Sequence, residues 1–329
     1  MTAATGVGSY PGEDFDEALK IVLGELPELP HLPEVPGRGP AAGLTGRGIA
    51  VLAELGADLQ PAGWRLTGGG AGVDHRRARS LLAQDLDAVE EQAQEYAGAF
   101  KIQVAGPWTL AATVEKPRGD KVLGDPGARR ELAQALAEGV REHVSGVRRR
   151  LPGVDRLVVQ VDEPALGAVL GGQVPTASGF HQHRSVDLPE ASQALEWVLE
   201  AAAEEGGEPW VHSCAPGTPL GLLRGAGARG LSIDLAMLSA ADHDVLAGAL
   251  EAGETVALGV VPATDPAHDP TDAQVTESVL RWLDLVGLDP HEARDRLVVT
   301  PACGLAGASP AWVRRALALL RTAAGNLSG

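Results

Sequence analysis

Eight short apolar runs of strand character alternate with helical segments along this 329-residue chain. Most runs are bounded by glycine, proline or charged residues and are followed by a segment with helical spacing of its apolar residues. This alternation predicts a parallel sheet, and eight repeats predict a (β/α)8 (TIM) barrel in which residues 1–329 form a single domain. A doubly wound sheet is the alternative, but no glycine-rich fingerprint follows the first run. The runs are 5–9, 63–67, 100–106, 156–162, 208–214, 230–235, 254–261 and 296–303.

The charge and composition of the chain exclude some classes of binding partner. The formal net charge of −17 would repel nucleic acid and anionic membranes, so we expect a small-molecule substrate. Two cysteines are too few for a disulfide framework, and the first residues form neither a basic nor an apolar leader. No apolar run is long enough to span a membrane. These features predict a cytoplasmic protein whose thiols are reduced.

Polar side chains gather at the predicted carboxyl ends of the strands. In a barrel these ends meet at one mouth, where enzymes of this architecture carry out their chemistry. One imidazole and two thiols among them are of the types that bind zinc. The residues at the predicted mouth are Ser9, Trp108, Asp162, Glu163, His212, Cys214, Asp234 and Cys303.

A zinc site is one hypothesis for this mouth. His212 and Cys214 are two apart in one run, so their side chains point to the same side of the strand. Cys303 ends the last run and Asp234 lies near the end of 230–235, so four ligands could surround one Zn²⁺. Ligands scattered over several strands are typical of an open, catalytic site. The alternative is that both cysteines are buried core thiols and His212 is a histidine with protein partners.

Two carboxylates follow each other at the end of the run 156–162. Adjacent residues of a strand point to opposite faces, so only one of Asp162 and Glu163 is expected to enter the mouth. There it could bind a substrate ammonium or act in general acid–base chemistry. A strand-end cap or a salt bridge is the alternative role.

A proline-rich segment, residues 26–40, lies between the first two predicted helices. Repeated prolines exclude a helix and favour an extended path. Loops of this length inside a compact domain are usually functional or disordered, and the charges of Glu34, Arg38 and Arg47 favour an active-site loop. A solvated surface loop is the alternative.

Five motifs resemble, in order, those of the C-terminal catalytic barrel of the cobalamin-independent methionine synthase family. The resemblance extends over nearly the whole chain. The motifs are Val7-Gly-Ser-Tyr-Pro11 (I-G-S-F-P in the family), Ala105-Gly-Pro-Trp-Thr109 (T-G-P-V-T), Gln160-Val-Asp-Glu-Pro-Ala-Leu166 (Q-I-D-E-P-A-L), His212-Ser-Cys214 (His-x-Cys) and Thr300-Pro-Ala-Cys-Gly-Leu305 (N-P-D-C-G-L).

The resemblance implies a methyltransferase that binds zinc through His212, Cys214, Cys303 and a carboxylate. The family uses Glu as that carboxylate, and Asp234 stands at the comparable place here. The open position of the metal would take the thiol of homocysteine, with Cys214 and Asp162 as the catalytic residues. Asp162 is expected to bind the ammonium of the substrate, and Ser9 and Gly8 are expected to bind its carboxylate. Glu34 and Trp108 are also expected to contact the substrate.

Departures from the family pattern concern the methyl donor. Thr113 stands where the family has a tryptophan that stacks on the folate pterin, and Thr264 aligns with the family's catalytic histidine. The second, N-terminal barrel of the family enzyme is not expected in a chain with one barrel's length. We therefore predict a donor other than methyltetrahydrofolate, with methylcobalamin on a corrinoid protein as the candidate.

Two other functions compete with this interpretation. A uroporphyrinogen-decarboxylase-like enzyme would share the barrel, need no metal, and use Arg38 and Arg47 for substrate carboxylates. A non-catalytic barrel would bind a thiol or a corrinoid partner without turnover. The decarboxylase-like alternative does not explain the three zinc-type ligands, and stoichiometric binding without product under any donor would favour the non-catalytic barrel.

Overall fold

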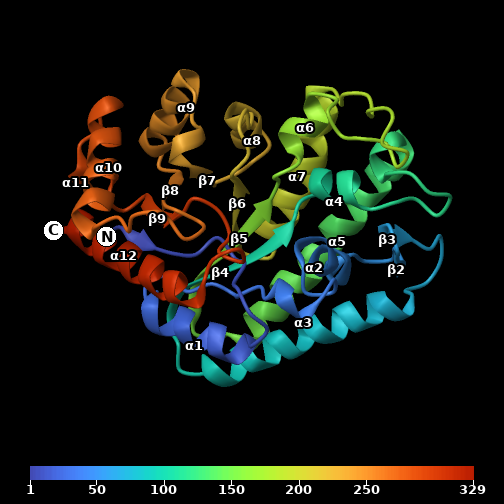
Figure 1. Ribbon diagram of the computed structural model, residues 1–329, viewed down its shortest axis with the longest axis horizontal. Helices are drawn as coiled ribbons and strands as arrows, with labels where there is room; N and C mark the ends of the chain where they lie inside the picture. Colours follow the sequence, from blue (N-terminus) through green and yellow to red (C-terminus); the bar gives the residue numbers. More distant parts are fainter.

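The computed structural model describes residues 1–329 and contains one curled parallel sheet surrounded by helices (Figure 1). Seven strands are hydrogen-bonded in the order β1-β9-β8-β7-β6-β5-β4, and all neighbours are parallel. This confirms an α/β fold of the TIM-barrel type. The strands are β1 (Ala3–Ala4), β4 (Gly98–Ala105), β5 (Val154–Asp162), β6 (Gly207–Ser213), β7 (Gly230–Asp234), β8 (Thr255–Val261) and β9 (Leu297–Pro301).

Part of the proline-rich segment, residues 29–35, bridges the two edges of this sheet. It makes one parallel bridge to β4, His31 with Lys101, and another to the chain just beyond β1, Ser9 with Glu34. Prolines lack the N–H that a regular ladder needs, so only isolated bridges form. The segment is buried and occupies the place of the second barrel strand. The alternative of a solvated surface loop is therefore wrong for this part, whereas the expected extended path is confirmed and Glu34 lies at the mouth.

The run 63–67 is not a barrel strand. Its residues form β3 (Gly63–Leu66), which pairs antiparallel with β2 (Ala57–Gln60) in a separate two-stranded hairpin. Alternation of apolar and polar residues fits a half-buried hairpin as well as a barrel strand, so the pattern did not distinguish them. The other predicted runs from 100–106 to 296–303 overlap β4 to β9.

The helices lie around the sheet, and the two ends of the chain lie side by side (Figure 1). One hydrophobic cluster of 86 buried residues fills most of the space between helices and sheet. No helix is both long and apolar enough to cross a membrane. The helices are α1 (Phe15–Glu25), α2 (Leu44–Val51), α3 (Val73–Gln92), α4 (Pro107–Thr113), α5 (Pro126–Arg150), α6 (Leu166–Leu170), α7 (Leu188–Glu204), α8 (Leu220–Gly225), α9 (Ala240–Glu251), α10 (Asp272–Leu285), α11 (Pro290–Ala293) and α12 (Pro310–Ser328).

The interior of the barrel is filled in layers. At the amino-terminal end, Arg156 forms a bidentate ion pair with Glu208 at 2.6 and 2.8 Å, and the Trp210 indole donates to the same carboxylate at 2.8 Å. A small apolar cluster comes next. Above it, Lys101 and Gln160 begin a buried polar layer that leads to the mouth. Substrate access is therefore expected from the carboxyl ends of the strands. The apolar cluster consists of Leu29, Val158, Trp210, Ala257 and Val298.

Candidate functional site

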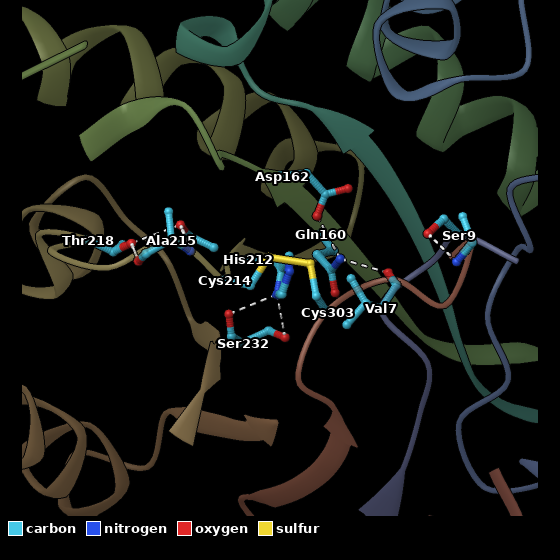
Figure 2. Close-up of a disulfide and its surroundings, with 12 residues drawn as sticks. Val7, Ser9, Gln160, Asp162, His212, Cys214, Ala215, Thr218, Ser232 and Cys303 are labelled. Atoms are coloured by element: carbon cyan, nitrogen blue, oxygen red, sulfur yellow. Dashed lines mark hydrogen bonds between the residues drawn. A yellow bond between two sulfur atoms is a disulfide. The ribbon is translucent and has the colours of Figure 1, made fainter. Parts of the chain in front are cut away.

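Cys214 and Cys303 meet across the mouth (Figure 2). They follow β6 and β9, are separated by 89 residues in sequence, and are joined as a disulfide with their Cα atoms 5.7 Å apart. The curl of the sheet brings these two strand ends within bridging distance although β7 and β8 lie between them. The expectation of two reduced thiols is therefore not met in this structure.

His212 presents an unpartnered nitrogen beside the two sulfurs. Its Nδ1 lies 3.0 Å from both the carbonyl oxygen and the hydroxyl of Ser232, and since a carbonyl only accepts, Nδ1 carries the proton. Nε2 is buried and has no hydrogen-bond partner. Burial, followed by the charge of Lys101, lowers the pKa of His212 to about 4, so the ring is neutral.

The three side chains fit a soft metal ion. Nε2 of His212 and the sulfurs of Cys214 and Cys303 all lie within 4.8 Å of one another. A neutral imidazole whose Nδ1–H is held by a second group is the usual form of a histidine ligand. Once the sulfurs are reduced, this donor set suits Zn²⁺.

Asp234 is not part of this group. Its carboxylate accepts from the backbone N–H of Ala236 at 2.9 Å and caps the short turn 235–237. The group of potential ligands contains only the histidine and the two cysteines. Asp234 therefore has the expected position in the chain, but its carboxylate binds a local backbone donor.

Asp162 and Glu163 point in different directions, as alternation along the strand predicts. Asp162 accepts from Gln160 Nε2 at 2.7 Å and is paired with His212 across β5 and β6. Burial first, then the neighbouring Glu34 charge, raises the pKa of Asp162 well above its usual value, whereas Lys101 lowers it. Asp162 is thus the carboxylate at the mouth.

Glu163 caps α4 and is fully buried. Its carboxylate accepts from the N–H groups of Trp108 and Thr109 at 2.9 and 2.8 Å and from the Thr109 hydroxyl at 2.7 Å. Burial raises the pKa of Glu163 to about 7, against the effect of these donors. The strand-end cap considered as an alternative for this pair is therefore the role of Glu163.

Gly106, directly before α4, leaves no room for a side chain beside Glu163. A Cβ there would overlap the carboxylate, which its three donors hold in place. We expect Gly106→Ala to lower the free energy of unfolding by about 2–4 kcal/mol in urea titrations. The control is Gly24→Ala, at an exposed position of α1 with no atom within 4 Å of the added Cβ, which should gain about 0.5 kcal/mol. Equal stabilities would contradict this assignment.

Trp108 does not line the mouth. Its indole is only 1% exposed, and its Nε1 donates to the carbonyl of Ala191 in α7 at 3.0 Å. Pro107 begins α4, and this helix directs the tryptophan into the helical layer. The prediction of a substrate contact by Trp108 was wrong for its side chain.

Gly8, Ser9 and Glu34 come together at the mouth beside the loop that carries Cys303. Ser9 accepts through its carbonyl from Leu305 N–H at 2.9 Å, and its hydroxyl lies 3.4 Å from Ala306 N. Glu34 N–H donates to the Gly8 carbonyl at 3.0 Å. The structure therefore brings together these three predicted residues.

The two arginines near Glu34 are already engaged. Arg47 donates to Glu34 at 3.1 Å and to Asp85 at 2.9 Å, and Arg38 forms a bidentate pair with Asp85 at 2.7 Å. Arg47 is only 5% exposed. This buried network argues against the decarboxylase-like function, which requires both arginines for substrate carboxylates.

The sequence analysis missed a buried lysine under the mouth. Lys101 is fully buried and donates to the Val7 carbonyl at 2.8 Å and to Gln103 Oε1 at 3.3 Å. Burial lowers its pKa to about 8, while Asp162 and Glu34 act in the opposite direction. A charged residue in the middle of an apolar run was the available signal, because lysine is almost never fully buried without partners.

Comparison with known proteins places the chain in a family. Residues 90–326 match the model of the cobalamin-independent synthase catalytic domain. The chain belongs to this family. The B12-independent methionine synthase from Shewanella sp. W3-18-1, solved with selenomethionine, is 16% identical, covers 99% of this chain and 98% of its own, and superposes with a TM-score of 0.66, which confirms the fold.

Other solved structures are less similar. A GH5_18 protein from Streptomyces cattleya in complex with GlcNAc has a TM-score of 0.43 at 15% identity, covering 98% of this chain and 79% of its own. 2,3-Dimethylmalate lyase has a TM-score of 0.39 at 11% identity, covering 95% of this chain and 80% of its own. No curated protein matches the chain.

Proposed function

We propose that this protein methylates the thiol of homocysteine or a close analogue at a zinc ion held by His212, Cys214 and Cys303. The observation that carries this proposal is the buried, unpartnered Nε2 of His212 within 4.8 Å of both sulfurs. Family membership and the match to a methionine synthase add support. Zinc, when bound, would lower the pKa of the acceptor thiol and so make a thiolate available near neutral pH.

The residues around the cysteines would bind the rest of the acceptor. Asp162, buried at the mouth, would receive the ammonium, with Glu34 as a second carboxylate held by Arg47. Gly8 and Ser9 would bind the carboxylate. In the reaction the thiolate sulfur forms a bond to the methyl carbon, and the bond between that carbon and the donor breaks with its electrons left on the donor.

Methylcobalamin or a corrinoid protein is the donor that we propose. Position 113 offers no aromatic ring for a pterin, because Thr113 is a small residue whose hydroxyl donates to the Thr109 carbonyl at 2.7 Å. Thr264, at the place of the family's histidine, is exposed on the loop after β8. A cytoplasmic location remains a prediction.

The test begins with reduction of the disulfide, followed by incubation with Zn²⁺ and removal of the excess. We expect about one equivalent of zinc, as for a mononuclear site. Methionine should then form from homocysteine with methylcobalamin and not with methyltetrahydrofolate. Reduced protein that takes up no zinc would refute the site, and product only from methyltetrahydrofolate would refute the donor. Stoichiometric thiol binding with no product from either donor would favour the non-catalytic barrel.

A further inference from the structure

The carbonyl of Val7 is held by two side chains from inside the barrel. Lys101 Nζ donates to it at 2.8 Å from β4, and Gln160 Nε2 donates at 2.9 Å from β5. The same Gln160 nitrogen donates to Asp162 at 2.7 Å, so Gln160 connects Val7 to the carboxylate at the mouth (Figure 2). All of these side chains are buried. A carbonyl with two such donors, one of them an ammonium, has little freedom to rotate.

Fixing this carbonyl also fixes the next N–H group. The peptide bond between Val7 and Gly8 is trans and planar, so the N–H of Gly8 points opposite to the carbonyl of Val7. Neither Gly8 N–H nor Ser9 N–H donates to any group of the protein. Both amides are therefore available to donate to a bound anion, and the Ser9 hydroxyl is adjacent to them.

The positive charge of Lys101 also favours the binding of an anion next to the Gly8 and Ser9 amides. No carboxylate lies within ion-pair distance of its ammonium, whose contacts are the Val7 carbonyl and the Gln103 amide oxygen. The nearest acidic groups that influence it are Asp162 and Glu34. A positive charge that is not neutralised by a direct partner favours an anion above the Val7–Gly8 peptide and disfavours a cation there.

We propose that Lys101 is a positioning residue: with Gln160 it orients the Val7–Gly8 peptide so that the Gly8 and Ser9 amides bind the carboxylate of an amino-acid thiol. The inference rests on the proposed function. It adds a requirement on the substrate, because the oriented amides would not increase the affinity for a thiol that has no carboxylate. Lys101 itself touches no substrate in this account.

The test compares three acceptors by titration calorimetry with reduced, zinc-loaded protein near pH 7. Homocysteine has both charged groups, 3-aminopropane-1-thiol lacks the carboxylate, and 4-sulfanylbutanoate lacks the ammonium. Lys101→Met keeps the length of the side chain. This variant should bind homocysteine and 4-sulfanylbutanoate about 10- to 100-fold more weakly than the wild type. Affinity for 3-aminopropane-1-thiol should change by less than about threefold, because the peptide that Lys101 orients contacts only the carboxylate. At Asp162 the loss of the lysine charge has two opposing effects, since it removes a repulsion of the ammonium and also raises the pKa of the carboxyl group.

The matched control is Thr300→Val, which removes a buried hydroxyl without a partner. It should leave all three affinities unchanged. If Lys101→Met does not fold, as judged by circular dichroism, Lys101→Gln gives the same comparison with a shorter, neutral side chain. Equal loss for all three acceptors, or no loss for any, would overturn the role of Lys101 while the proposed function stands. Zinc-loaded wild type that fails to bind homocysteine would refute the proposed function itself.

Discussion

The Cys303→Ser variant is expected to lose its zinc and, with it, thiol methylation. Cys303 supplies one of the two sulfurs in the group with His212, and a serine hydroxyl is a poor ligand for a metal that favours thiolates. Zinc binding by small four-ligand Cys/His sites is worth about 10–16 kcal/mol, so each ligand of such a site accounts for roughly 3–4 kcal/mol, or about 10²- to 10³-fold in affinity. We expect a loss of this size for Cys303. Metal content after dialysis and titration against a competing chelator measure the loss.

Asp234→Asn is the matched control for this experiment. Because the Asp234 carboxylate accepts from Ala236 and stands outside the group of three, this variant should keep its zinc within about tenfold of wild-type affinity. Both variants and the wild type must be compared after reduction, since the disulfide occupies both sulfurs of the wild type. Full zinc occupancy in Cys303→Ser would contradict the site. Loss of zinc from Asp234→Asn would instead identify Asp234 as a fourth ligand.

The grouping of His212, Cys214 and Cys303 could be predicted because it depends on two regular features. Side chains alternate along a strand, and the carboxyl ends of parallel barrel strands converge. These rules place residues that are 89 positions apart at one mouth without any knowledge of loops. They also separate Asp162 from Glu163, since neighbours on a strand must point to opposite faces.

The closing strand of the barrel could not be predicted by the same rules. Residues 29–35 contain prolines and lack a regular ladder, so their sequence has the signature of a loop. Their place in the barrel is set by the gap that β1 and β4 leave, which is a tertiary effect. The hairpin strand β3 has the local pattern of a barrel strand but no place in the sheet.

The predicted roles of two side chains were wrong because each side chain forms a hydrogen bond to a nearby backbone group and does not point into the mouth. Asp234 accepts from a backbone N–H two residues away, and Trp108 donates to a carbonyl of α7. Both bonds depend on how the chain turns after a strand, which residue spacing does not describe. Lys101 gave a usable signal in the sequence, but its partner, the Val7 carbonyl, is 94 residues away.

The Asp162→Asn variant is expected to lose about 10²- to 10⁴-fold in kcat/KM for homocysteine, because removing one member of a buried charge pair costs about 3–5 kcal/mol. Burial raises the pKa of Asp162, so an incoming ammonium supplies the countercharge that the free site lacks. Asparagine keeps the shape of the side chain, but it cannot supply that charge. Steady-state kinetics with zinc content measured on the same samples test the effect.

Two comparisons make this expectation specific to the ammonium. Asp155→Asn, at the exposed opposite end of the same strand, should leave kcat/KM unchanged. With 4-sulfanylbutanoate, which has no ammonium, Asp162→Asn should approach wild-type activity, the reverse of the pattern expected for Lys101→Met. Asp162→Asn could instead lower kcat/KM equally for acceptors with and without an ammonium while zinc stays bound. In that case Asp162 would maintain the structure of the mouth, and Glu34 would have to bind the substrate ammonium.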